Sequence, residues 1–425
     1  MMTHRKSTGE PNLLLLYPRS PLPITSGLHV HEFELMRWLS RYYQITLLAQ
    51  AHSDAELASR QELLKYCQRV ELVPSIWRRY RWLIPLAQSI SLFHGIDYMQ
   101  QERRFGPVKH KLLQILREEK FDVAVAHIYQ IASYFFRYLP TSTIKVVNTA
   151  DIFFERELDR DSKAGFPLNL PVLERRRRLR KEREIDTLSN SDIIIAVTKK
   201  DQATLRQALH NPVQVVYAPA VLDLASVKPQ WGPETNQDIL SVIPLQSLFN
   251  EDAFRFLINE IWPQIKKRAP EVRLTIVSAD MPGRLAESLP HDPNLLVKGY
   301  LSSSELDQEY IRAAAVLVTV RGGSGIKTKV ITAMAHGKAV VSTPAGVEGL
   351  EVENGVHLMV ADDPEDYAER TIRVLQDLEL RERVKHQARS FIEKNFTQEK
   401  IYSELAQALC LKDEQQKVEG FENYH

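Results

Sequence analysis

The sequence predicts an α/β protein made of two doubly wound, Rossmann-like domains that face each other across a cleft. Short apolar runs alternate with longer amphipathic segments along the chain, which is typical of a parallel sheet covered by helices. The alternation stops at Lys-Pro-Gln-Trp-Gly-Pro-Glu, residues 228–234, and then starts again. The chain has 425 residues, and a single core rarely grows past ~250–300 residues. We therefore expect two domains.

Each element is placed by its hydrophobic pattern. In the first half the expected strands are Leu13–Tyr17, Ile45–Ala49, Val70–Val73, Asp122–Ala126, Lys145–Asn148, Asp192–Val197 and Val213–Tyr217. In the second half they are Ile239–Ile243, Arg273–Val277, Leu295–Val297, Ala315–Val320, Ala339–Ser342 and Val356–Val360. The expected helices are His29–Arg41, Val108–Lys120, Val172–Leu188, Lys200–Leu209, Asp252–Arg268, Ser303–Ala313 and Ile326–His336. A further helix is expected after Asp363, an N-cap residue followed by proline at the first helical position.

The break in the alternation sets the expected domain boundaries. Residues 1–227 form the N-terminal domain, 228–236 the linker and 237–395 the C-terminal domain. The linker assignment rests on its two prolines and glycine. Residues 396–425 are expected to form a helix and tail that pack back on the N-terminal domain.

Composition limits the partners and the location. The net charge of +1 gives no basic domain for nucleic acid, and the two cysteines are too far apart in sequence for a disulfide scaffold or a zinc site. The apolar run Leu13–Leu16 is too short for a signal peptide. No stretch reaches the ~18 apolar residues of a membrane span, so a cytoplasmic protein is expected.

Two segments leave peripheral contact with the inner face of a membrane open. Arg175–Lys181 is either a surface helix with ion pairs to nearby glutamates or a site that attracts anionic lipid headgroups or a lipid-diphosphate acceptor. Trp77–Ile84 interleaves aromatic residues with arginines, which suits a membrane interface, an acceptor-binding loop or packing under the first domain.

A glycine-rich turn gives the strongest functional signal. Arg321–Gly325 directly follows an apolar strand and leads into an expected helix. Glycines let the main chain approach a ligand closely, and the N-terminus of a helix attracts anions. Arg321, Lys327 and Lys329 would oppose the helix dipole unless an anion is present. We interpret the turn as a diphosphate site; the alternative is a tight strand-to-helix turn with solvated lysines.

The stretch from Arg321 to Thr343 resembles the C-terminal signature of the group-one retaining glycosyltransferases, family four of the enzymes with the GT-B fold. The similarity extends to further segments of the second domain: Asn250–Ala253, Ile261–Pro263, Gly346–Leu350 and Leu358–Pro364. In the first domain the resemblance is looser, at Tyr17–Arg19, Ser26-Gly27 and Asp122–His127. The resemblance thus covers nearly the whole chain and is specific in the second domain.

The resemblance implies a nucleotide-diphosphate sugar as donor, bound by the C-terminal domain, and a glycan or lipid-linked acceptor, bound by the N-terminal domain. Lys327 and Lys329 would neutralise the diphosphate leaving group, and His127 would contact the transferred sugar. The other expected donor-binding residues are Gly27, Arg321, Gly322, Gly323, Ser324, Gly325, Thr332, Glu348, Gly349 and Leu350. Neither a metal nor a separate cofactor is expected, because lysines and a helix dipole meet the charge of the diphosphate.

Departures from the family pattern leave a second interpretation open. Ser324 and Thr332 stand where the family often has two glutamates, and Ile243 stands in a strand end where glycine is usual. Threonine in place of the second glutamate would give up a charge-assisted hydrogen bond to ribose, worth ~1.5–3 kcal/mol. The alternative is a catalytically weak or inactive subunit of the same fold that binds nucleotide or glycan and scaffolds a partner transferase.

Overall fold

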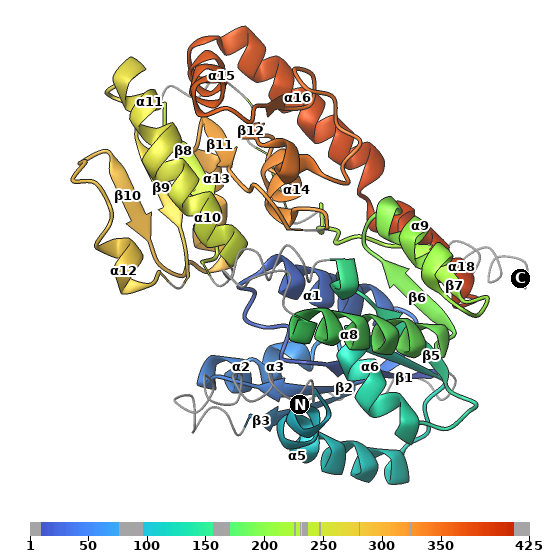
Figure 1. The fold of residues 1–425 in the computed structure, drawn as a ribbon. Coiled ribbons are helices and arrows are strands. Elements are labelled where there is room, and N and C mark those ends of the chain that lie inside the picture. The colour runs from blue at the N-terminus through green and yellow to red at the C-terminus, as the bar shows by residue number, and fades with distance from the viewer. Residues whose placement is uncertain are drawn as a thin grey trace, which may run out of the picture. The chain divides into compact units, whose positions relative to one another are not determined.

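The computed structural model describes residues 10–75, 97–155, 171–224, 227–229, 231, 237–245, 248–279, 281–323 and 325–411 (Figure 1). The chain divides into two compact units. The first unit contains Met1–Ile24, His31–Pro219 and Ile401–His425, and the second contains Thr25–Val30 and Ala220–Lys400.

The first unit is built on a parallel seven-stranded sheet with the order β3-β2-β1-β4-β5-β6-β7. Its strands are β1 (Asn12–Tyr17), β2 (Gln44–Ala51), β3 (Arg69–Pro74), β4 (Val123–His127), β5 (Ile144–Asn148), β6 (Ile193–Ala196) and β7 (Gln214–Tyr217). The register pairs Leu13 of β1 with Ile45 on one side and Val123 on the other. Both faces of the central strands β1 and β4 are buried, as is typical of parallel strands covered by helices.

Helices follow the strands of the first unit as crossover connections. They are α1 (Gly27–Leu39), α2 (Asp54–Ala58), α3 (Arg60–Leu63), α5 (Asp97–Glu118), α6 (Tyr129–Phe135), α8 (Pro171–Ser189) and α9 (Lys199–Ala208), with a 3₁₀ turn, η3 (Phe136–Tyr138). At the chain end lie α17 (Gln398–Ile401) and α18 (Ser403–Ala408). Glu404 of α18 accepts hydrogen bonds from Tyr217 N at 2.9 Å and Gln202 Nε2 at 3.0 Å, which ties α18 to β7 and α9.

The second unit contains a parallel six-stranded sheet with the order β10-β9-β8-β11-β12-β13. Its strands are β8 (Ile239–Val242), β9 (Leu274–Val277), β10 (Leu295–Lys298), β11 (Ala315–Val318), β12 (Ala339–Ser342) and β13 (Met359–Val360). Its helical elements are α10 (Leu248–Phe256), the π-helical turn η4 (Leu257–Ile261), α11 (Trp262–Arg268), α12 (Gly283–Ala286), α13 (Ser303–Arg312), α14 (Thr328–Ala335), the 3₁₀ turn η5 (Pro344–Val347), α15 (Pro364–Gln376) and α16 (Leu378–Asn395).

Both sheets reverse their strand order at one point, and that point positions the sites. In the first sheet β1 lies beside β4, and in the second β8 lies beside β11. In open α/β sheets, ligands bind outside the carboxyl ends of the two strands at such a switch point. The loops after β1 and β4, and after β8 and β11, are therefore where ligands are expected to bind.

The prediction of two parallel, doubly wound sheets is confirmed, and each predicted strand overlaps an observed one. Asp363 caps α15, accepting from Glu365 N at 2.9 Å. Helix starts were predicted less well: α5 begins at Asp97 rather than Val108, and α10 begins at Leu248 rather than Asp252. Helices α1 and α14 begin at Gly27 and Thr328 rather than at His29 and Ile326. Among the described residues, no helix is both long and apolar enough to span a bilayer.

Candidate functional site

The glycine turn after β11 depends on glycine at two positions. Gly323 has φ +89° and Gly325 has φ +77°, in the left-handed region that other residues rarely adopt. A Cβ on Gly323 would lie 3.6 Å from the ring of Phe249, so the turn packs against the start of α10. The predicted site residue Ser324, between these glycines, lies outside the described residues. Gly323 and Gly325 thus lie after β11, at the switch point of the second sheet.

Lys329, in the first turn of α14, is half-buried and its side chain reaches toward helix α10. Its Nζ donates to Asn250 Oδ1 at 3.2 Å, and Asn250 Nδ2 donates to Pro244 O at 2.8 Å. Burial, and secondarily the charge of Lys327, lower the pKa of Lys329 to about 8. In the described part of the chain, no carboxylate pairs with this ammonium. Its positive charge is therefore destabilised where it stands.

Lys327 is the N-cap residue of α14 and folds back on the glycine turn. Its Nζ donates to Gly325 O at 2.7 Å and to Gly323 O at 2.9 Å. The ammonium thus satisfies two carbonyls of the turn and brings positive charge close to Lys329. The structure brings these two predicted lysines together at one helix N-terminus.

Arg321 has a different environment from the two lysines. Its guanidinium donates to both carboxylate oxygens of Asp252, at 2.8 and 3.2 Å, and lies 3.8 Å from Glu260. It also lies over the Phe256 ring, 4.3 Å from its centroid. The hydrogen bonds to Asp252 raise the pKa of Arg321 above its ordinary value. Acidic residues of α10 and η4 therefore compensate the charge of Arg321, a pairing that the sequence did not predict.

The other residues expected in the donor site lie on the same unit. Gly322 is half-buried in the turn, and Thr332 is half-buried on α14, where its carbonyl accepts from the His336 backbone. Glu348 and Gly349 are exposed after η5, with Gly349 at φ +82°, and Leu350 is buried. These loops follow β11 and β12, which are neighbours in the sheet.

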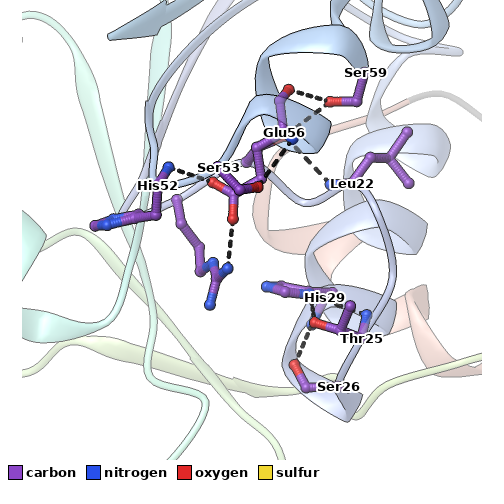
Figure 2. A network of polar contacts seen from close by, with 10 residues as sticks. Leu22, Thr25, Ser26, His29, His52, Ser53, Glu56 and Ser59 are labelled. Atoms are coloured by element: carbon purple, nitrogen blue, oxygen red, sulfur yellow. Dashed lines mark hydrogen bonds and ion pairs between the residues drawn. The ribbon is translucent and has the colours of Figure 1, made fainter. Parts of the chain in front are cut away.

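Gly27 is the first residue of α1 and belongs, with Thr25–Val30, to the second compact unit. Ser26 caps this helix, because its Oγ accepts from His29 N at 3.4 Å, as Figure 2 shows. A Cβ on Gly27 would come within 2.6 Å of Thr328 Oγ1. Glycine is therefore required by close approach to the first residue of α14.

His127 is the last residue of β4 and its side chain is fully buried. Its Nδ1 lies 3.3 Å from Asn148 Nδ2 and 3.6 Å from Glu32 Oε1. Its ring makes edge contacts with Tyr17 and His31, at centroid distances of 5.7 and 6.1 Å. The predicted position at a strand end is correct, and the polar neighbours of His127 were not predicted.

Backbone strain marks the same sheet edge. Ile128, directly after His127, has φ +65° and ψ +145°, and Ala150, two residues after Asn148, has φ +55°. A β-branched residue at positive φ is costly, and such strain clusters at functional sites. No sequence signal points to it, because isoleucine is not a residue from which positive φ is expected.

The two segments that left membrane contact open differ in what the structure shows. Trp77–Ile84 lies outside the described residues. On α8, Arg178 lies 3.9 Å from Glu182 at i,i+4, and Arg176 is buried. The Arg178–Glu182 pair agrees with a helix that carries ion pairs, whereas the buried Arg176 does not face solvent.

Comparison with known proteins decides the family. Residues 237–377 match the model of the family described as glycosyl transferases group 1. This segment is a group 1 glycosyltransferase domain. The predicted family is thereby confirmed, and with it the prediction that the chain is a glycosyltransferase.

The group 1 glycosyltransferase domain and the first unit together have the fold of solved GT-B structures. Anabaena HepE in complex with UDP-glucose is 16% identical, with a TM-score of 0.64 over 94% of this chain and 99% of that one. Sucrose-phosphate synthase of Thermosynechococcus elongatus is 13% identical, with a TM-score of 0.67 over 94% and 98%. The predicted GT-B-like fold is confirmed.

A relative in sequence is an uncharacterised 44.6 kDa protein in the cps region of Klebsiella pneumoniae. It is 22% identical over 379 residues, which cover 85% of this chain and 90% of the relative. The similarity to this chain therefore extends beyond the group 1 glycosyltransferase domain.

Proposed function

We propose that this glycosyltransferase moves a sugar from a nucleotide-diphosphate donor to a glycan or lipid-linked acceptor. The observation that carries the proposal is the half-buried ammonium of Lys329, which has a neutral amide oxygen as its partner at a helix N-terminus. An anionic ligand is the partner that this charge lacks.

The leaving group of such a transfer is a nucleoside diphosphate, on which negative charge develops as the bond to the sugar breaks. Lys329, Lys327 and the N-terminal amides of α14 would stabilise that charge electrostatically. Gly323 and Gly325 would let the main chain approach the phosphates. His127 would contact the transferred sugar, and Glu348–Leu350 would lie near it.

Two findings support the identity of the donor and the acceptor class. HepE, whose fold this chain shares, was solved with UDP-glucose, and TarM of S. aureus was solved with UDP, fondaparinux and α-GlcNAc-glycerol. The relative in the cps region suits a role in polysaccharide synthesis. We further propose a cytoplasmic location and a reaction that retains the anomeric configuration.

The test is a panel of nucleotide sugars scored by the release of nucleoside diphosphate, with and without glycan and lipid-linked acceptors. We expect one donor to give release that depends on both its concentration and the acceptor. A protein that shows no saturable binding of any nucleoside diphosphate up to millimolar concentration would refute the proposal.

A further inference from the structure

A buried polar cluster lies behind the strained end of β4, in the first unit. Glu32 of α1 is 0% exposed, and neither of its carboxylate oxygens has a hydrogen-bond partner among the described residues. Burying an ionised carboxylate without partners costs far more than burying a neutral acid. Burial raises the pKa of Glu32 well above its ordinary value, Arg19 opposes this shift and Glu56 adds to it.

Arg19, whose positive charge acts on Glu32, forms an ion pair with another carboxylate. Arg19 forms its ion pair with Glu56 of α2, whose other oxygen accepts from His52 N at 2.7 Å. Figure 2 shows Glu56 among His52, Ser53 and Ser59, at the centre of its own network. The Glu56 carboxylate therefore competes with Glu32 for Arg19.

The other ionisable groups around Glu32 add no positive charge. Tyr17 of β1 donates through its hydroxyl to the Glu32 carbonyl at 3.0 Å, and burial raises the pKa of Tyr17 well above its ordinary value. Burial lowers the pKa of His31 to about 4, so this imidazole is neutral at pH 7. A further neighbour of Glu32 among the described residues is His127, whose Nδ1 lies 3.6 Å from Glu32 Oε1.

The Nδ1 atom of His127 thus faces two groups that can each supply a hydrogen. Asn148 Nδ2 lies 3.3 Å away, and a protonated Glu32 carries an O–H close by. A ring nitrogen that accepts a hydrogen bond carries no proton, so the proton of a neutral imidazole is on the other nitrogen. We infer that Glu32 and Asn148 are positioning residues that hold His127 uncharged, with its proton on Nε2.

This inference adds detail to the proposed function. It depends on that function for one point, the contact between His127 and the transferred sugar. An Nε2–H is a hydrogen-bond donor, so His127 would donate to a hydroxyl oxygen of the transferred sugar. An ionised Glu32 would instead favour a proton on Nδ1 and an imidazolium ring.

The tautomer can be read without any activity assay. The full chain labelled with ¹⁵N-histidine gives two-bond ¹⁵N–¹H correlations at pH 7, and a His127→Gln variant assigns the signals. In the wild type we expect Nδ1 unprotonated and Nε2 protonated. A wild-type ring protonated on Nδ1, or on both nitrogens, would overturn the inference.

Three variants separate the two positioning residues. Glu32→Gln should keep the wild-type pattern, because its amide is neutral and still donates. Glu32→Met removes that donor and should give a mixture of tautomers, and Asn148→Asp should move the proton to Nδ1. Asn190→Asp, the same change at an exposed position, is the matched control. A Glu32→Met spectrum identical to that of the wild type would overturn the role of Glu32. An Asn148→Asp spectrum identical to that of the wild type would overturn the role of Asn148.

Activity then tests the consequence. If Glu32→Met does not fold, as judged from the other histidine signals, Glu32→Gln and Asn148→Asp still decide the tautomer. In a folded Glu32→Met protein we expect kcat/KM to fall about two- to tenfold, the loss of one neutral hydrogen bond, with rescue by Glu32→Gln. If the wild type releases no nucleoside diphosphate, the proposed function fails, while the spectra still decide the state of His127.

Discussion

Replacing Lys329 by methionine removes the charge that the proposed diphosphate site depends on. The ammonium is half-buried and has a neutral partner, Asn250 Oδ1 at 3.2 Å. Hydrogen bonds to charged groups contribute ~1.5–3 kcal/mol, so we expect the Kd for a nucleoside diphosphate to rise about 10- to 150-fold. Lys267→Met, at an exposed lysine on α11, is the control, and its Kd should stay within about twofold of the wild type.

The pH dependence of the same binding sharpens this test. The pKa of Lys329 is about 8 in the free protein, and a bound anion raises it by favouring the charged form. Above pH 8 the free lysine must take up a proton on binding, so Kd should rise about tenfold per pH unit. Isothermal titration calorimetry from pH 7 to pH 9.5 measures it. An equal pH slope in wild type and Lys329→Met, or an unchanged Kd at pH 7, would refute our reasoning.

Three further predictions concern stability. The pKa of Lys329 is lower in the folded protein than in the unfolded chain, so the unfolded chain binds more protons above pH 8 and wild-type stability should rise toward pH 10.5. Lys329→Met should then be about 1–3 kcal/mol more stable than wild type at pH 7, and this difference in stability should vanish near pH 10.5. Urea unfolding of both proteins at both pH values measures the difference. The same difference at pH 7 and pH 10.5 would contradict the prediction. Gly323→Ala forces alanine into φ +89°, so the free energy of unfolding should fall by ~1–2 kcal/mol and Tm should be lower. Gly106→Ala is the control: it lies in α5, where a Cβ meets nothing within 4 Å, and its effect on stability should be neutral or stabilising. Asp252→Asn breaks a half-exposed ion pair with Arg321, so its unfolding free energy should fall by no more than ~1 kcal/mol; a larger loss in chemical unfolding would show that the pair holds the turn in place.

The order of elements could be predicted because the central strands of each sheet, such as β1, β4 and β11, are buried on both faces and appear as continuous apolar runs. Helix starts were less accessible to sequence reasoning. The hydrophobic pattern after Gly325 predicts that Lys327 is helical. Its hydrogen bonds to Gly323 O and Gly325 O instead hold it in the turn, as the N-cap residue outside α14. Helix α6 was missed because Tyr129–Phe135 is apolar on nearly all sides and shows no helical period.

The candidate site was predictable where chemistry is local in sequence. The glycines and lysines of 322–329 lie together in the chain, so their shared position follows from strand, turn and helix alone. The pairing of Arg321 with Asp252 joins residues 69 positions apart, and the approach of Glu32 to His127 joins helix α1 to strand β4. Neither contact produces a periodic pattern in the sequence, because contacts between side chains of different elements depend on how those elements pack in the folded protein.

The first two turns of α10 contact cationic side chains on both sides of the glycine turn. Asn250 holds the amine of Lys329, and Asp252 holds the guanidinium of Arg321. A small rotation of that helix would shift both cations at once. Substitutions on α10 can therefore change anion affinity through Lys329 and Arg321, and screens for altered donor preference should include residues 248–256.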